Sequence, residues 1–289
     1  MTSKLFLFVI LIVAIAYTQP ALNRRTISGV QLKTLPESNW QFSSQAIFPT
    51  FLKIRDPKTN KMIDLPESFV RTEVLLQNDF IYALTNRFNV LVSVPLRWRN
   101  YFSPDLIQKN KGIGDLWLGG YFQLTRNINS QFFVITPTGQ NKNLKPTELP
   151  LGEGAFQLGG ALNTTFSVFN IPLVLSASYL YRAKDNNKID LGDQLGLLVS
   201  SANYLKTDYG NFLYETGLII KHRFSDKLNG KSLANSDFNS ATLFAGFNFY
   251  YNPNLRFGLS VPFSVYHREA WLTDYAIVLN FDLLLRNLK

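Results

Sequence analysis

The side chains best suited to chemistry in this sequence are two histidines, His222 and His267, because the chain contains no cysteine. A zinc site would need both histidines, together with carboxylates brought in from distant segments. Lipid hydrolysis is a second chemistry, with a histidine acting as base toward a nearby nucleophile. Neither histidine has a Gly-x-His-x-Ser context, because the two local sequences read Lys-His-Arg and Tyr-His-Arg. We therefore expect no catalytic residue, no cofactor and no metal site.

A larger set of charged residues recurs at alternate positions of extended segments. Ionisable side chains that face a pore tune its ion selectivity, whereas pairs of opposite charge brace its wall, and the two roles are compatible. The candidates for a lumen-facing position are Arg71, Glu73, Asp79, Arg97, Arg99, Asp115, Arg182, Glu215, Lys221, Arg223, Arg256, Asp274 and Asp282.

Other short motifs carry little chemical information. The glycines Gly112 and Gly114 are followed by neither a helix nor a Lys-Ser/Thr pair, so they do not form a phosphate-binding loop. Asn163 begins a glycosylation-type tripeptide, but it lies within an expected strand. The net charge is +9, yet lysine and arginine are interleaved with acidic residues rather than gathered into a stripe. The sequence therefore predicts no nucleic-acid partner.

The elements that position these residues are strands. Between 88 and 99 apolar residues alternate with mostly polar ones, and the same alternation recurs in 116–124, 255–266 and 274–283. A period of two indicates a β-strand with two unlike faces. No window of comparable length has helical periodicity, and 24 Phe and 13 Tyr also favour strands and membrane interfaces.

The pattern predicts an all-β fold, a transmembrane antiparallel β-barrel of about 12 strands of the outer-membrane type. Most runs exceed the ~9–11 residues that cross a bilayer at a tilt, and closing an even number of strands leaves no unpaired edge. The expected strands are 40–53, 67–84, 88–99, 113–125, 131–138, 154–167, 171–182, 192–204, 211–224, 239–251, 255–267 and 271–284.

Connection lengths support the same fold, because short turns alternate with longer polar loops along most of the chain. The short turns centre on 86–87, 126–127, 170, 207–210 and 252–254, where Asn, Asp and Gly tolerate tight backbone geometry. The longer loops carry lysines, and the last connection, around 268–270, is an exception because it is short. Short turns on one side and long loops on the other are typical of outer-membrane barrels.

Which face of the strands lines the interior follows from the width of the barrel. About twelve strands enclose an interior too wide for side chains to fill, so we expect the polar face to line the lumen and the apolar face to contact lipid. A soluble sandwich or barrel with its apolar face inward is the alternative. Aromatic residues near strand ends favour the membrane; they are Trp98, Tyr179, Tyr181, Trp271 and Tyr275 at the outer rim, and Phe88, Tyr214, Tyr251, Phe257 and Phe281 at the inner one.

The first residues resemble an export signal. Lys4 precedes the apolar run 5–16, which is too short to span a bilayer as a helix and ends in a small-residue cleavage site, Ala-Ile-Ala. We expect residues 1–16 to be a signal peptide, with cleavage as late as residue 21 an open alternative. Residues 22–289 should form a single β-barrel domain preceded by a short N-terminal periplasmic segment. The expected location is the bacterial outer membrane.

Several glycine-rich stretches resemble the outer-membrane protein family named for the meta-pathway of phenol degradation, whose members are regarded as transporters. The resemblance covers 67–160. It rests on Asn-Arg at 86–87 before Val-Ser-Val-Pro at 92–95, on Gly-Ile-Gly-Asp-Leu-Trp-Leu-Gly at 112–119, and on Pro-Thr-Gly at 137–139 leading to Leu-Gly-Glu-Gly at 151–154. It implies a barrel and uptake of small, apolar molecules, without catalytic residues.

The sequence as a whole favours a non-enzymatic outer-membrane barrel that acts as a passive channel or transporter for small solutes, apolar or anionic. Its expected partners are outer-membrane lipids, lipopolysaccharide and a small-molecule solute, whereas the oligomeric state is unspecified. Two alternatives remain open. One is a phospholipase-like, lipid-modifying enzyme, because His222 and His267 both project from the apolar face near the outer rim; the other is a structural or surface-binding barrel with a plugged lumen.

Overall fold

The computed structural model describes residues 34–55, 62–65, 68–169, 171–185, 187–207, 210–233, 236–252, 254–267 and 271–285. The expected signal peptide and the residues that follow it up to 33 lie outside this range. No helix within the described ranges is long and apolar enough to cross a membrane.

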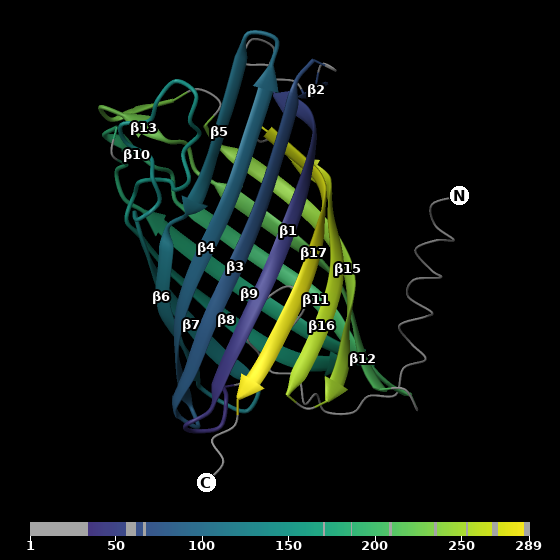
Figure 1. Ribbon diagram of the computed structural model, residues 1–289. Coiled ribbons are helices and arrows are strands. Elements are labelled where there is room, and N and C mark those ends of the chain that lie inside the picture. The colour runs from purple at the N-terminus through teal and green to yellow at the C-terminus, as the bar shows by residue number, and fades with distance from the viewer. Residues whose placement is uncertain are drawn as a thin grey trace.

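Twelve long strands form a closed antiparallel barrel, as the sequence predicts. The ring closes because β1 pairs with β17 along most of its length (Figure 1). The strands are β1 (Trp40–Arg55), β3 (Val70–Thr85), β4 (Phe88–Ser103), β6 (Leu116–Gln123), β7 (Ile128–Thr136), β8 (Gln157–Val168), β9 (Ile171–Arg182), β11 (Gln194–Thr207), β12 (Gly210–Arg223), β15 (Phe238–Asn252), β16 (Leu255–His267) and β17 (Trp271–Leu285).

Neighbouring strands are joined by short turns at one end, where β1 also begins and β17 ends; we call this the inner end. The opposite, outer end carries the long loops (Figure 1). Five short strands lie in these loops: β2 (Met62–Asp64) pairs antiparallel with the outer end of β1, β5 (Leu106–Ile113) pairs with β4, and β10 (Ile189–Asp190), β13 (Lys227–Leu228) and β14 (Lys231–Ser232) form a separate sheet.

The β4–β5 hairpin differs from the sequence prediction. The chain at 100–112 was expected to be a loop, but β4 continues to Ser103 and β5 returns alongside it as far as Ile113. Lysines interrupt the apolar alternation of 106–113, so only the cross-strand pairing with β4 identifies this segment as a strand. The hairpin therefore extends the barrel wall outward (Figure 1).

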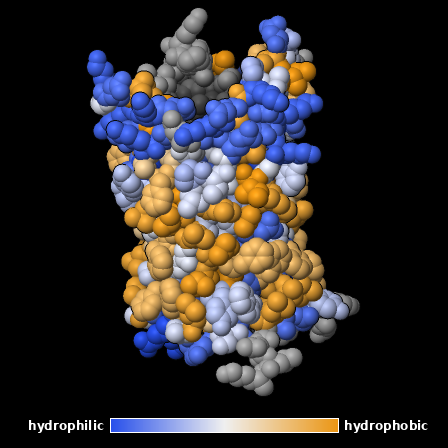
Figure 2. Space-filling model, turned by 60° about the vertical axis from the view of Figure 1, so that its left-hand side comes forward, coloured by the Kyte–Doolittle hydropathy of each residue, from blue (hydrophilic) through white to orange (hydrophobic). Residues whose placement is uncertain are grey.

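The outward face of the wall is apolar. Figure 2 shows apolar side chains gathered over the middle of the wall on the face in view, with hydrophilic residues above and below. We call this surface the apolar belt, and its members are between 36% and 53% exposed although they are hydrophobic. They include Val92, Leu118, Phe132, Leu158, Leu162, Leu197, Val199, Ile220, Leu243, Phe247, Val261, Phe263, Ile277 and Leu279. Such a surface requires lipid rather than water around it.

The aromatic residues expected at the two rims lie on this outward face where their side chains are described. Trp98, Tyr179, Tyr181 and Tyr275 are 40–47% exposed at the outer rim, and Tyr214, Tyr251 and Phe257 are 45–69% exposed at the inner one. Within the belt, the polar pair Ser44 and Asn78 bond to each other at 3.0 Å, so this polar patch is internally satisfied.

The inward face is mixed rather than purely polar. Its buried polar residues, no more than 8% exposed, include Gln41, Ser43, Asp79, Asn89, Ser93, Asn129, Gln157, Asn163, Ser176, Ser200, Glu215, Ser240, Asn248, Ser260 and Asp282. Apolar side chains lie between them, and Val174, Leu198 and Phe244 form one buried cluster. The interior is thus more closely filled by side chains than the strand number alone predicts.

This packing changes what we expect of charged substitutions. The sequence suggests that a charge at Ser93, Gln123 or Ser260 would be solvated, but Ser93 is 0% and Ser260 only 5% exposed. To compare a charge on the outward face with one on the inward face, a better inward-facing position is Thr242, which is partly exposed. Val92→Lys should reduce the folded fraction strongly, since a basic residue facing lipid near the midplane costs about 2–4 kcal/mol, whereas Thr242→Lys should be tolerated. The band shift between heated and unheated gel samples measures this, and equal folding of both variants would contradict the assigned sidedness.

Candidate functional site

Asp115, just before β6, holds the long β7–β8 loop (137–156) against the outer mouth. Its carboxylate is nearly buried, and Oδ1 accepts the N–H of Gly139 at 2.9 Å while Oδ2 accepts the N–H of Glu153 at 2.7 Å. Hydrogen bonds from backbone N–H groups to a charged carboxylate are about twice as strong as neutral ones. Asp115 therefore clamps the two stems of the loop together.

Glycines make this approach possible. A Cβ at Gly152 would lie 2.1 Å from Oδ1 of Asp115, and one at Gly139 would lie 3.0 Å from it. Gly154 has φ +69°, in the left-handed region that favours glycine. The Pro-Thr-Gly and Leu-Gly-Glu-Gly motifs of the sequence thus let the loop backbone reach the clamp, and Leu151, the first residue of the second motif, is 3% exposed.

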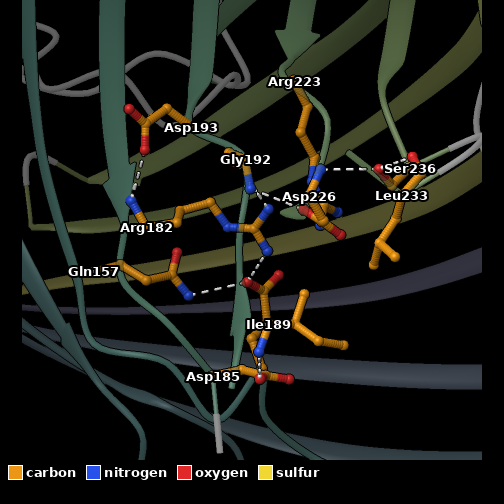
Figure 3. A network of polar contacts seen from close by, with 11 residues as sticks. Gln157, Arg182, Asp185, Ile189, Gly192, Asp193, Arg223, Asp226, Leu233 and Ser236 are labelled. Atoms are coloured by element: carbon orange, nitrogen blue, oxygen red, sulfur yellow. Dashed lines mark hydrogen bonds and ion pairs between the residues drawn. The ribbon is translucent and has the colours of Figure 1, made fainter. Parts of the chain in front are cut away.

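A second anchor is Arg182, the last residue of β9, which is 3% exposed. Its guanidinium forms an ion pair with Glu153 through Nη2 and donates through Nη1 to the carbonyl of Gly192 at 3.2 Å. Its backbone N–H donates to Oδ1 of Asp193 at 3.0 Å (Figure 3). Gln157 also donates to Glu153, at 3.1 Å. Arg182 therefore ties the β7–β8 loop to the β9–β11 loop.

Asp226 extends the network to a third loop, between β12 and β15. Its Oδ1 accepts the N–H of Gly192 at 2.8 Å, and both carboxylate oxygens lie 2.7 Å from Nη2 of Arg223 (Figure 3). The Asp226 N–H donates to the hydroxyl of Ser236 at 2.8 Å. Three outer loops are thereby fixed to one another and to the ends of β9 and β12. We call the residues Asp115, Glu153, Arg182, Asp193, Arg223 and Asp226 the mouth network.

On the opposite wall, arginines from β3 and β4 share one carboxylate. Glu73 lies 3.0 Å from Nε of Arg99 and 3.4 Å from Nη2 of Arg71. Arg99 also donates through Nη1 to the carbonyl of Pro150 at 2.5 Å, so this wall too contacts the β7–β8 loop. Nε of Arg97 is buried and has no hydrogen-bond partner among the described residues.

The remaining lumen candidates lie deeper or apart. Arg256 and Asp282 form a buried pair near the inner end, and Glu215, 0% exposed, accepts the hydroxyl of Ser200 at 2.8 Å. Asp79 is buried and Lys221 is exposed. The side chain of Asp274 lies outside the described part. The structure thus brings the arginines of the mouth together but gives most of them an acidic partner.

The inner end contains a side chain that sequence reasoning missed. Leu35, 0% exposed, packs against Ile81, Ala83, Leu91 and Tyr121, which all belong to the inward face. The N-terminal segment that contains Leu35, residues 34–39, is held in place by hydrogen bonds. The Ser38 N–H donates to the carbonyl of Ala83 at 2.9 Å, and Thr34 and Glu37 bond to Asn86. The N-terminal segment therefore enters the inner opening and narrows it.

His222 lies on the outward face near the outer rim. Its Nδ1 is 2.7 Å from Oδ1 of Asn239, and its ring meets Phe224 edge to face. Asn239 orients the imidazole, but no contact found in the described part joins a serine hydroxyl to it. The side chain of His267 lies outside that part.

Sequence reasoning also missed the loop carboxylates Glu153, Asp193 and Asp226. Glu153 and Asp226 lie outside the expected strands, so no periodic pattern assigns them a face. Asp193 falls within the expected strand 192–204 but precedes β11, which begins at Gln194. The sole signal was the glycine on each side of Glu153, which indicates a backbone that must approach another group closely.

Comparison with known proteins establishes the fold. The chain matches no family model and no curated protein. It is similar to the crystal structure of the COG4313 outer membrane channel from Pseudomonas putida F1, with TM-score 0.72 and 12% identity over 93% of this chain and 100% of that one. It is also similar to the β domain of the Bordetella autotransporter BrkA, with TM-score 0.57 and 8% identity over 86% of this chain and 99% of that one.

These likenesses confirm the outer-membrane β-barrel fold. With the apolar belt and the exposed rim aromatics, this fold supports a location in the bacterial outer membrane. The barrel implied by the motifs at 67–160 is confirmed as a fold, whereas the link to phenol degradation stays a prediction.

Proposed function

We propose that the protein is a passive outer-membrane channel for small solutes, with no covalent chemistry. The observation that carries this proposal is a closed barrel, apolar outside and largely polar inside, whose β7–β8, β9–β11 and β12–β15 loops are bonded to one another and to the strand ends at its mouth. A barrel built only as a membrane anchor would not need a network of this kind at its mouth. The structural likeness to a protein described as an outer membrane channel supports the same function.

The two narrowed ends suggest the size and character of the solute. The β7–β8 loop occupies the outer mouth and Leu35 lies in the inner opening, so passage favours small molecules. The clusters around Leu35 and Val174 give the inner path apolar surfaces between its polar residues. Small, partly apolar solutes fit this lining, and the resemblance at 67–160 implies the same class.

The proposal is tested by reconstitution of the purified barrel in liposomes. Flux of small aromatic alcohols and acids should exceed that of empty liposomes, and it should fall as solute size increases. Liposomes with the folded barrel that leak no faster than empty ones, for any solute tried, would support a plugged structural barrel instead.

The charge arrangement at the mouth gives a second expectation. An anionic solute would be favoured by the summed charge of the basic lumen candidates at the outer mouth, but Arg99, Arg182 and Arg223 have acidic partners. Arg97 has no ion pair in the described part, so we expect weak anion selectivity that depends mainly on this residue. Arg97→Ser should shift the reversal potential toward cations in planar bilayers under a salt gradient, whereas Lys231→Ser on the exposed sheet should not. If Lys231→Ser shifted the reversal potential more than Arg97→Ser did, Arg97 would not be the source of the selectivity.

A lipid-modifying enzyme is the second candidate, favoured by one observation, the His222–Asn239 pair at the lipid-facing rim. If it were correct, His222→Ala would abolish fatty-acid release from phospholipid vesicles by the folded barrel. We expect release to stay at background in both wild type and variant. Release by the wild type that disappears in the variant would replace the channel proposal.

A further inference from the structure

The two faces of the β4–β5 hairpin have different surroundings. On β5, Ile107, Lys109, Lys111 and Ile113 are exposed, and they alternate with the partly buried Gln108, Asn110 and Gly112. The inward residues bond to the β7–β8 loop: Gln108 donates to the carbonyl of Pro146 at 2.9 Å and Asn110 to that of Leu149 at 2.6 Å. The two lysines therefore project from the outward face, away from the mouth.

The position of these lysines relative to the apolar belt follows from the register of β4 and β5. Trp98, on the outward face, pairs with Lys111, and Asn100 pairs with Lys109. The wall from Phe88 to Trp98 rises about 23 Å, at about 3.3 Å per residue and a tilt of about 45°, which is close to the height of a lipid-facing band. Lys111 therefore lies at the outer edge of the apolar belt and Lys109 just above it.

Both ammonium groups are without an ion pair in the described ranges. Nζ of Lys109 lies 5.3 Å from the ring centroid of Phe102, which holds it against the outward face. Close by, Asn100 donates to the hydroxyl of Thr72 at 3.2 Å. Alternate residues of a strand lie about 6.6 Å apart, so two lysine side chains can reach one anionic group between them. The neighbouring apolar residues, Trp98 beside Lys111 and Ile113 below it, are 40% and 52% exposed and suit acyl chains.

We propose that this surface, formed by Lys109 and Lys111 with Trp98 and Ile113, binds the phosphate group of a lipid in the outer leaflet. The charge complements a phosphate at headgroup level, and the belt below accepts the acyl chains of the same molecule. Lysines at an anionic membrane surface add about fivefold each to binding, so the pair contributes roughly thirtyfold. The site depends on the location in the membrane and is independent of the channel function.

The test uses the full-length barrel in detergent micelles and measures binding of bisphosphorylated lipid A, with its dephosphorylated form as a second probe. Lys109→Gln/Lys111→Gln should weaken binding of the phosphorylated lipid by roughly thirtyfold. The matched control, Lys227→Gln/Lys231→Gln, removes the same charge from the exposed β13–β14 hairpin and should bind like wild type. The dephosphorylated lipid should bind weakly and equally to all three proteins.

Folding is checked in each sample by the heat-dependent gel shift, and only folded protein is compared. The site would be overturned if both double variants lost binding equally, which indicates general attraction by the outer loops. It would also be overturned if the double variant at the proposed site bound like wild type. Inorganic phosphate added as competitor should not displace the lipid, because it lacks acyl chains; displacement at millimolar concentration would instead identify a free-anion site.

Discussion

Asp115→Ala is expected to raise the flux and the single-channel conductance of the barrel by about tenfold or more. The substitution removes the acceptor for the N–H groups of Gly139 and Glu153. Hydrogen bonds to charged groups each contribute about 1.5–3 kcal/mol, and a change of 1.4 kcal/mol is a factor of ten in population. The β7–β8 loop should then leave the mouth for a much larger share of the time. Planar-bilayer recordings and liposome flux both measure the change.

Two further variants separate the clamp from a simple change of charge. Gly152→Ala keeps every charge but directs a Cβ at the carboxylate of Asp115, so it should raise conductance in the same direction. Asp105→Ala removes one carboxylate from the exposed tip of the β4–β5 hairpin and should leave conductance unchanged. A correctly folded Asp115→Ala barrel with the conductance of wild type would show that the loop does not limit passage.

Leu35→Asp should have the second large effect, at the inner end. A leucine in an apolar cluster contributes about 2–5 kcal/mol relative to alanine, and a carboxylate cannot stay buried there without a partner. The N-terminal segment should therefore leave the inner opening, and conductance should rise. Because the two ends are in series, the double variant with Asp115→Ala should conduct more than either single variant.

Glu37→Gln is the matched control for this end. The Glu37 side chain is exposed, and the segment is held there through its backbone N–H, which donates to Asn86 at 2.9 Å. The variant should therefore behave like wild type. Equal conductance of Leu35→Asp and wild type in the same bilayer would mean that the inner segment leaves the path open.

The sequence by itself determined the twelve strands of the wall, the turns between them and the two faces of the wall, but not the β4–β5 hairpin. These features are local: alternation within 88–99 is visible without any partner strand, and Asn, Asp and Gly mark tight turns because of their own backbone preferences. Closure followed from the even strand number. The exposed Val92 and the buried Ser93 lie on the faces that the alternation predicts.

The tertiary structure decided which charges act together. Asp115 and Glu153 are 38 residues apart, and neither carries a local sign of the other. Arg182 was assigned to the lumen by alternation, but its partner Glu153 lies in a loop, where no period defines a face. Leu35 has an apolar side chain in a short segment, so only the closed inner opening reveals its contacts. Strand pairing is repetitive and can be inferred from pattern, whereas loop packing depends on single contacts that exist only once the barrel has closed.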